Sequence, residues 1–175
     1  NLSPLEAQEM DPQQRLFLME AWKALEDAGY AGLANEGQRY GVFVGCAPGD
    51  YAQLLEQAGR LDSGQAFLGN SGSILAGRLA YFLDFHGPAL AVDTACSSSL
   101  VAVHLACQSL RSGDSDLTLA GGVALMLTPS LQVRSSRVGM LSPTGTSDPF
   151  AAGANGIGLG EGVGVVVLKR LADAI

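Results

Sequence analysis

Basic residues are scarce in this sequence. Ten lysines and arginines stand against 17 aspartates and glutamates, so the formal net charge is −7 and the sequence pI is about 4.6. A nucleic-acid-binding surface needs clustered Lys and Arg side chains, and we therefore expect no nucleic-acid partner. An acidic surface of this kind suits a cytoplasmic protein.

Cysteine is also scarce. Cys46, Cys96 and Cys107 form an odd set without paired spacing. This pattern fits neither a disulfide framework nor a zinc site. It favours a reducing compartment instead.

Long apolar runs are absent. Each hydrophobic stretch is interrupted by Gly, Ser or a charged residue before it reaches the length of a membrane span. No basic start followed by an apolar core and a cleavage site marks a secretory signal. A start methionine is missing too, so we expect the chain to be part of a longer protein. Its 175 residues, 47% of them hydrophobic, are enough for one globular domain with a sizeable core.

The most informative stretch that is present surrounds Cys96. An apolar run over 89–92 leads into it, and a second apolar run begins at Leu100, with no helix breaker before Gly113. This pattern predicts a strand, a tight turn and a helix, with Cys96 at the turn. A helix N-terminus carries about half a positive charge and unpaired N–H groups. Such a site favours a nucleophilic thiolate and can stabilise a developing oxyanion.

The helix that follows Cys96 is apolar nearly all round over 100–110, with His104 and Gln108 as the main exceptions. Such a helix is expected to be buried between layers, which would place Cys96 at the bottom of a cleft. The alternative is that Cys96 is one more small buried hydrophobic residue, as most free cysteines are. Position alone favours neither interpretation.

The segment Asp93–Leu100 reads DTACSSSL, and it resembles the active-site signature of β-ketoacyl synthases. It is most similar to the ketosynthase domains of modular type I polyketide synthases. Further motifs match this family in its order and near its spacing: Asp11–Arg15, Gly87–Ala89, Ala120–Val123, Leu141–Pro143 and Gly160–Gly164. The resemblance covers essentially the whole chain and implies that Cys96 is the catalytic nucleophile.

This resemblance also implies a fold, an activity and partners. The fold would be α/β and thiolase-like, layered, with mostly parallel sheets. Residues 1–175 would be a partial ketosynthase domain, largely the N-terminal half plus the first strand of the C-terminal half, without the family's first strand.

The implied activity is that of an acyltransferase in polyketide biosynthesis. Cys96 would accept an acyl chain from the phosphopantetheine arm of an acyl carrier protein, for decarboxylative Claisen condensation with a malonyl-type extender. Expected partners are the acyl carrier protein, the remainder of the synthase chain and a second copy, because in the family the strand before the cysteine pairs with its twin. No bound metal or cofactor and no membrane are implied.

Patterns along the rest of the chain predict alternating helices and strands, which indicates an α/β fold with a mostly parallel sheet. Asp11 is expected to cap a helix that begins at Pro12 and stops at Gly29, with Gln14 as capping-box partner. The other expected elements are a loop over 1–10, strands over 40–46, 89–92, 117–124 and 163–168, helices over 51–57 and 74–85, a small-residue turn over 67–73, and loop with a short helix over 128–147.

Several further features keep more than one interpretation. Arg15 is expected to be structural and near a carboxylate. The glycine-rich run over 153–164 is not expected to bind a nucleotide, because no Lys-Ser or Lys-Thr follows it and it leads into a strand. Glu161, inside that run, either supports the site through hydrogen bonds or is purely structural. The turn over 67–73 is an ordinary N-cap or, by the resemblance, lies near the subunit interface and the acyl pocket.

The expected catalytic set is incomplete. The family stabilises the enolate with two histidines from its second half, whereas this chain has only His86 and His104. His104 lies about 12 Å along the helix from Cys96, and His86 precedes it by about 30 Å of extended chain, so both are expected to be structural. Ala151 and Asn155 replace acidic residues frequent in the family. Asn155 also resembles ketosynthases of the trans-acyltransferase kind.

Two rival functions remain open from the sequence. In the first, the chain is a non-condensing acyl-binding or scaffolding module, in which Cys96 is acylated but no carbon–carbon bond forms. Alternatively it is a cysteine hydrolase of unrelated architecture, which needs a histidine within reach of Cys96. By the leading hypothesis, these residues alone are not expected to condense.

Overall fold

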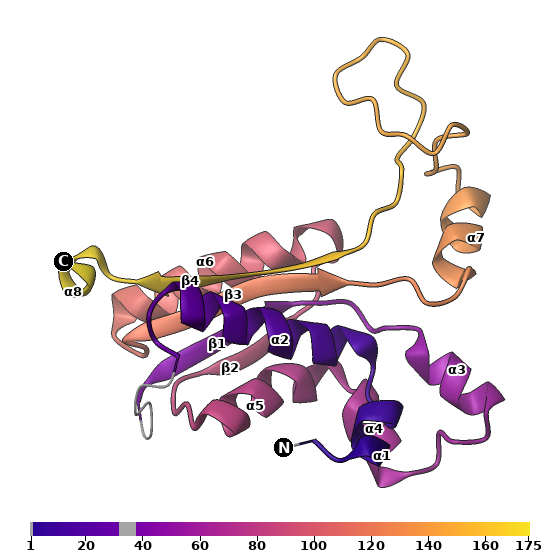
Figure 1. Cartoon of the computed structure of the whole chain (residues 1–175). Helices are drawn as coiled ribbons and strands as arrows, with labels where there is room; N and C mark the ends of the chain where they lie inside the picture. Colours follow the sequence, from indigo (N-terminus) through magenta and orange to yellow (C-terminus); the bar gives the residue numbers. More distant parts are fainter. Residues whose placement is uncertain (1, 32–37) are drawn as a thin grey trace.

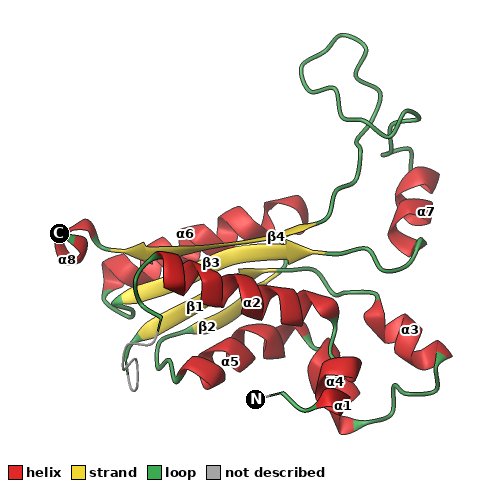
Figure 2. Ribbon diagram, viewed as in Figure 1, coloured by secondary structure: helices red, strands yellow, loops and turns green. Residues whose placement is uncertain are grey.

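The computed structural model describes residues 2–31 and 38–175 and shows a sheet between two helical layers (Figures 1 and 2). The strand order is β2-β1-β3-β4. β1 is parallel to both of its neighbours, and β4 runs antiparallel to β3. The strand bounds are β1 Tyr40–Gly45, β2 Ala89–Val92, β3 Leu117–Ala124 and β4 Gly162–Lys169.

Helices precede, separate and follow these strands. The helix bounds are α1 Pro4–Glu9, α2 Pro12–Asp27, α3 Tyr51–Gln57, α4 Gly64–Asn70, α5 Gly72–Leu83, α6 Ser98–Ser112, α7 Ser130–Arg137 and α8 Leu171–Ala174, with a short 3₁₀ turn, η1, at Ala95–Ser97. Within the described ranges, no helix is both long and apolar enough to span a lipid bilayer.

The two faces of the sheet bury different helices, because successive side chains of a strand point to opposite sides. On β1, Val42 and Val44 join the larger core with Phe17 of α2 and Leu79 of α5. Phe43, between them, packs on the other face against the alanines of α6, Ala102 and Ala106. One layer is therefore α6 and the other is α2 with α5 (Figure 1).

The α/β fold with a mostly parallel sheet is confirmed, and the expected strands lie within one or two residues of the observed ones. The strand expected to open a second half was misassigned. It is β4, and it pairs with β3 along its whole length, so it completes this same sheet.

The expected loop over 1–10 was wrong. Residues Pro4–Glu9 form α1, in which Pro4 occupies the first turn and the Ser3 hydroxyl accepts a hydrogen bond from Glu6 N at 3.2 Å. Serine as N-cap followed by proline is a strong helix start. The buried Glu9 fixes the end of α1, because it pairs with Arg60 at 3.1 Å.

The expected turn over 67–73 was wrong in part. Its first residues belong to α4, which Ser63 caps by accepting from Ala66 N at 2.9 Å. The capping role of Asp11 on α2 is confirmed by its 2.8 Å bond from Gln13 N. Gln14 is not a capping-box partner, because its amide instead donates to Leu68 O and Ser71 O.

Candidate active site

Cys96 lies in η1, in the connection between β2 and α6, as the sequence predicts. The connection stands at the carboxyl end of β2, and parallel β1 ends beside it, because Cys46 N donates to Val92 O at 3.0 Å. Sites of α/β proteins form at this edge of the sheet. Helix α6 begins at Ser98, two residues beyond the thiol.

The turn that carries Cys96 is fixed by hydrogen bonds among its own side chains. Asp93 Oδ1 accepts from Ala95 N at 3.0 Å, and Ser98 Oγ accepts from Thr94 N at 2.9 Å while donating to Ala95 O at 2.7 Å. Ala95 has φ 57°, in the left-handed region that is unfavourable for a residue with a Cβ. Such strain persists only where surrounding contacts over-determine the conformation. These contacts hold the Cys96 backbone in one position.

Two glycines let the start of α6 approach the sheet closely. A Cβ on Gly45, the last residue of β1, would lie 2.4 Å from both Ser98 C and Ser99 N. A Cβ on Gly122 of β3 would lie 2.7 Å from the Ser99 Cβ. The first turn of the helix therefore rests directly on strand backbone.

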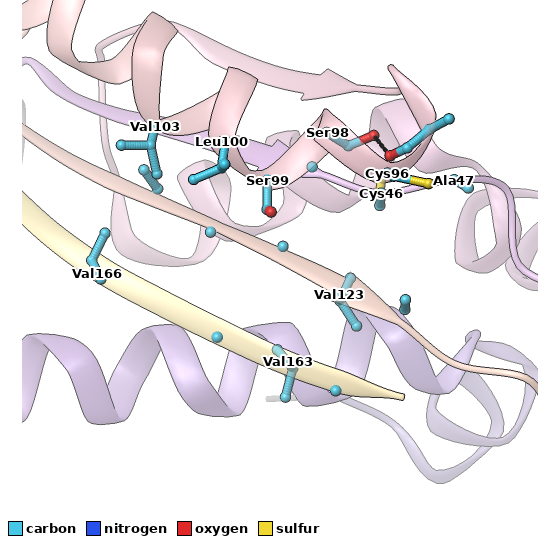
Figure 3. Close-up of a pocket in the computed structure, with 18 residues that line it drawn as sticks. Cys46, Ala47, Cys96, Ser98, Ser99, Leu100, Val103, Val123, Val163 and Val166 are labelled. Atoms are coloured by element: carbon cyan, nitrogen blue, oxygen red, sulfur yellow. Dashed lines mark hydrogen bonds between the residues drawn. The ribbon is translucent and has the colours of Figure 1, made fainter. Parts of the chain in front are cut away.

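An apolar groove of about 640 Å³ opens beside Cys96 (Figure 3). Its walls come from the ends of β1, β3 and β4 and from the first turns of α6. Among its lining residues are Cys96, Ser99, Leu100, Val103, Val123 and Val163. An accessible thiol beside an apolar groove of this size can hold an acyl group as a thioester.

The expected burial of α6 and Cys96 is not observed in the described chain. The side chain of Leu100 is 74% exposed, and Cys96 itself is exposed. The sheet covers only the face of α6 that carries Ala102 and Ala106. Cys96 therefore lies on the side of an open groove and not at the bottom of a cleft.

The other two cysteines have different surroundings. Cys46 is buried at the end of β1, and burial raises the pKa of its thiol, with the carboxylates of Asp93 and Asp11 adding to the effect. Cys107, on α6, is partly buried and does not line the groove. Of the three thiols, Cys96 is the one that is both exposed and at the groove.

The two histidines lie away from the groove lining. His86 precedes β2, at the opposite end of that strand from Cys96, and its Nε2 lies 3.2 Å from Asp84 Oδ1. His104 is exposed on α6. Within the described residues, 2–31 and 38–175, no histidine donates a hydrogen bond to the Cys96 thiol or accepts one from it. The hydrolase interpretation therefore gains no support from the structure.

Arg15 and Glu161 have the following surroundings. Arg15 makes no salt bridge within the described ranges, and its Nε is buried without a hydrogen-bond partner there. It does act on a carboxylate: burial raises the pKa of Asp11, and the Arg15 charge opposes that rise.

Glu161 is exposed but hydrogen-bonded, since its Oε1 accepts from Met126 N at 2.6 Å.

Sequence reasoning missed Asp50. It precedes α3 yet makes no side-chain capping bond there, because its carboxylate accepts from Leu127 N, Thr128 N and the Thr128 hydroxyl. Burial alone would raise the pKa of Asp50, but the bonds from Thr128 and Leu127 outweigh it and hold the pKa below its ordinary value. The partners lie 77 or 78 positions away, and no local pattern signals such a contact.

Across the part of the chain that the structure describes, no three His, Cys, Asp or Glu side chains gather into a group that could hold a metal ion.

The fold and this cysteine turn define a class of enzyme. Residues 1–174 match the family profile "Beta-ketoacyl synthase, N-terminal domain", and the chain belongs to that family. Its curated relatives are polyketide synthases, and its structural neighbours are ketosynthase domains of such synthases.

The relatives include two proteins of Mycobacterium tuberculosis. The chain is 52% identical over 170 residues to phthioceranic/hydroxyphthioceranic acid synthase, covering 97% of this chain and 8% of that protein. It is 54% identical over 179 residues to one subunit of the phenolphthiocerol/phthiocerol polyketide synthase, covering 100% of this chain and 8% of that protein. The chain therefore spans a small part of the relatives it matches.

Solved structures give the same result. The ketosynthase from module 6 of the bacillaene synthase of Bacillus subtilis 168 superposes with a TM-score of 0.90 at 46% identity. That match covers 99% of this chain and 29% of the other. An oxazolomycin ketosynthase domain of Streptomyces albus JA3453 gives 0.89 at 42% identity, covering 99% and 30%.

Proposed function

We propose that this chain is the acyl-accepting part of a polyketide synthase ketosynthase, with Cys96 as its nucleophile. The observation that carries the proposal is the position of Cys96, an exposed thiol on a fixed turn beside an apolar groove. Family membership and the polyketide synthase relatives support the same assignment.

In the proposed first step, the Cys96 thiolate attacks the thioester carbonyl of an acyl group carried on the phosphopantetheine arm of an acyl carrier protein. The carbon–sulfur bond to pantetheine breaks, a Cys96 thioester forms, and the pantetheine thiol leaves. Backbone N–H groups at the start of α6 are suited to stabilise the oxyanion of the tetrahedral intermediate.

In the second step, a malonyl-type extender on a carrier protein loses CO₂ and becomes an enolate. The enolate carbon attacks the Cys96 thioester, a carbon–carbon bond forms, and the Cys96 thiolate is released. Neither His86 nor His104 lies at the groove. In the proposal, the imidazoles that stabilise the enolate come from outside these 175 residues, and the chain alone does not condense.

The proposed partners are the acyl carrier protein, the rest of a larger synthase and a second copy of this chain. β2 supports the last of these. It is an edge strand, and Ala89, Leu90 and Ala91 are exposed. An exposed edge offers unpaired backbone groups to another strand, and pairing of two copies here would bring two Cys96 turns near the same interface.

Assignment to the trans-acyltransferase kind stays a prediction from Asn155. The structure gives this residue a local role, since its Oδ1 accepts from the Ser142 hydroxyl at 2.9 Å. The assignment is checked by whether the parent synthase carries its own acyltransferase domain.

The test is a condensation assay with the complete ketosynthase-containing protein, an acyl-loaded carrier protein and a malonyl-loaded one. We expect one CO₂ and one β-ketoacyl carrier per turnover, no product with Cys96→Ala, and normal turnover with the control Cys107→Ala. Condensation by Cys96→Ala would contradict the proposal. Acylation of Cys96 without condensation would favour a non-condensing acyl-binding domain, which no present observation favours.

A further inference from the structure

The segment that follows β3 is held in an unusual way. From Leu125 to Thr128, four successive backbone N–H groups all donate to side-chain acceptors. The acceptors come from three separate parts of the chain: Gln13 on α2, Glu161 before β4 and Asp50 before α3.

Each of these contacts is within hydrogen-bond length. Leu125 N donates to Gln13 Oε1 at 3.2 Å, and Met126 N donates to Glu161 Oε1 at 2.6 Å. Asp50 Oδ1 then accepts from Leu127 N at 3.1 Å, and its Oδ2 accepts from Thr128 N and the Thr128 hydroxyl, each at 2.7 Å. Bonds to carboxylates are stronger than neutral ones.

These side-chain acceptors take the place of the backbone hydrogen bonds that a neighbouring strand would provide. β3 stops at Ala124, so its continuation has no neighbouring strand to pair with, and backbone N–H groups need partners. Gly49 makes the arrangement possible. A Cβ there would lie 1.9 Å from Asp11 Oδ2 and 2.7 Å from Gln13 Nε2, so only glycine lets the Asp50 loop come this close to the start of α2.

The segment 125–128 begins next to the Cys96 groove. Ala47, Val123 and Ala124 line both that groove and a neighbouring cavity of about 380 Å³. The cavity is also lined by Leu125 and Met126, the first residues of the segment. The segment therefore lines the cavity next to the groove, where a long group on Cys96 that passed Val123 and Ala124 would meet it, whereas a short group would stay beside the thiol.

We propose that Gln13, Asp50 and Glu161 are positioning residues that fix the segment 125–128 as a wall of the substrate channel. Through that wall they set how well long acyl groups are accepted at Cys96. The inference rests on the proposed function, because it assumes that Cys96 is acylated. None of the three side chains is required to touch the reacting atoms.

The bonding pattern makes the variants unequal. Asp50 accepts with both oxygens, so Asp50→Asn turns an NH₂ group toward a backbone N–H. Glu161 accepts with one oxygen, so Glu161→Gln can keep its bond while losing the charge, and Glu161→Ala cannot. Asp62→Asn, at an exposed position, is the matched control for the loss of one carboxylate.

The test uses the complete ketosynthase-containing protein and two probes, acetyl and dodecanoyl N-acetylcysteamine thioesters. Cys96 acylation is followed by mass spectrometry, alongside alkylation by iodoacetamide and the thermal midpoint. We expect Asp50→Asn and Glu161→Ala to slow dodecanoyl loading about tenfold, which corresponds to the free energy of about one hydrogen bond to a charged group. Acetyl loading should slow less than twofold. Iodoacetamide alkylation stays unchanged, and Glu161→Gln and Asp62→Asn behave as wild type.

The dodecanoyl-to-acetyl ratio decides the outcome. An unchanged ratio in Asp50→Asn, or an equal fall in both rates together with the thermal midpoint, would overturn the positioning role and leave the proposed function standing. Failure of the unmodified protein to load either thioester at Cys96 would overturn both.

Discussion

At the scale of single residues, the site depends on positions where a side chain is absent. Gly45 and Gly122 have no Cβ at the points where Ser98 and Ser99 rest on the sheet. Ala95, next to Cys96, keeps its Cβ and adopts a left-handed φ of 57°. The location of the Cys96 thiol therefore follows from backbone contacts of its neighbours.

Two glycine substitutions test whether the start of α6 needs this close approach to the sheet. Gly45→Ala is expected to lower the free energy of unfolding by about 1–3 kcal/mol, because a Cβ 2.4 Å from Ser98 and Ser99 forces α6 off the sheet. Gly77→Ala, on α5 with nothing within 4 Å of the new Cβ, is expected to raise it by about 0.5–1 kcal/mol. Urea unfolding of the complete domain measures both. Equal effects of the same sign would show that the close approach at Gly45 is unimportant.

At the scale of elements, the strands and the turn that carries Cys96 were predictable from sequence. β1 and β3 are short apolar runs, as strands covered on both faces tend to be, and β2 is a shorter apolar run at the edge of the sheet. The position of Cys96 between a strand and a helix was predictable because the whole motif is local in the sequence. Its surroundings in the turn, Asp93 and Ser98, belong to that same motif.

Other elements were missed because they depend in part on contacts between distant residues, although Ser3 and Ser63 give α1 and α4 local N-caps. Helices α1 and α4 are short, and the pairing of Glu9 with Arg60 and the bond between Gln14 and Leu68 O hold them. The wall after β3 depends on Gln13, which lies 112 positions from Leu125. The apolar pattern of α6 predicted burial on all sides. In the described chain, the sheet covers only the face that carries Ala102 and Ala106.

The edge strand β2 carries a prediction about assembly. Leu90 is 45% exposed on this edge, so Leu90→Lys is expected to weaken a dimer paired through β2, because Lys on an edge strand opposes pairing. Sedimentation equilibrium of the complete ketosynthase should show a dissociation constant raised at least tenfold. Leu171→Lys, at a 75% exposed position on α8, is the control and should leave the dimer intact. If neither variant dissociates, the copies do not meet through β2.

At the scale of the whole molecule, three segments far apart in sequence meet at Asp116. Its Oδ1 pairs with Arg170 at 2.9 Å and with Arg39 at 3.1 Å. The hydrogen bond from Arg170, reinforced by the charge of Arg39, lowers the pKa of Asp116 below its ordinary value. The start of β1, the start of β3 and the end of β4 are thereby joined.

Because the pKa of Asp116 is lowered in the folded protein, the stability that this cluster contributes should fall as the pH is lowered. Stability from this cluster is fully present above the unfolded-state pKa and is lost as pH falls through the lower folded-state pKa. Asp116→Asn should therefore unfold at a lower temperature than wild type at about pH 6, with the difference shrinking below about pH 4. The exposed control Asp62→Asn should show no such convergence. A gap that stays constant down to about pH 3, or widens, would contradict the role of this cluster.

The central claim is that Cys96 is the residue that becomes acylated, and peptide mapping tests it most directly. The complete ketosynthase is incubated with an acyl-loaded carrier protein, quenched, digested and sequenced by mass spectrometry. We expect a single acyl adduct on the peptide that contains Cys96, and none on the corresponding peptide of Cys96→Ala. An adduct on Cys46 or Cys107 with Cys96 left free would contradict it.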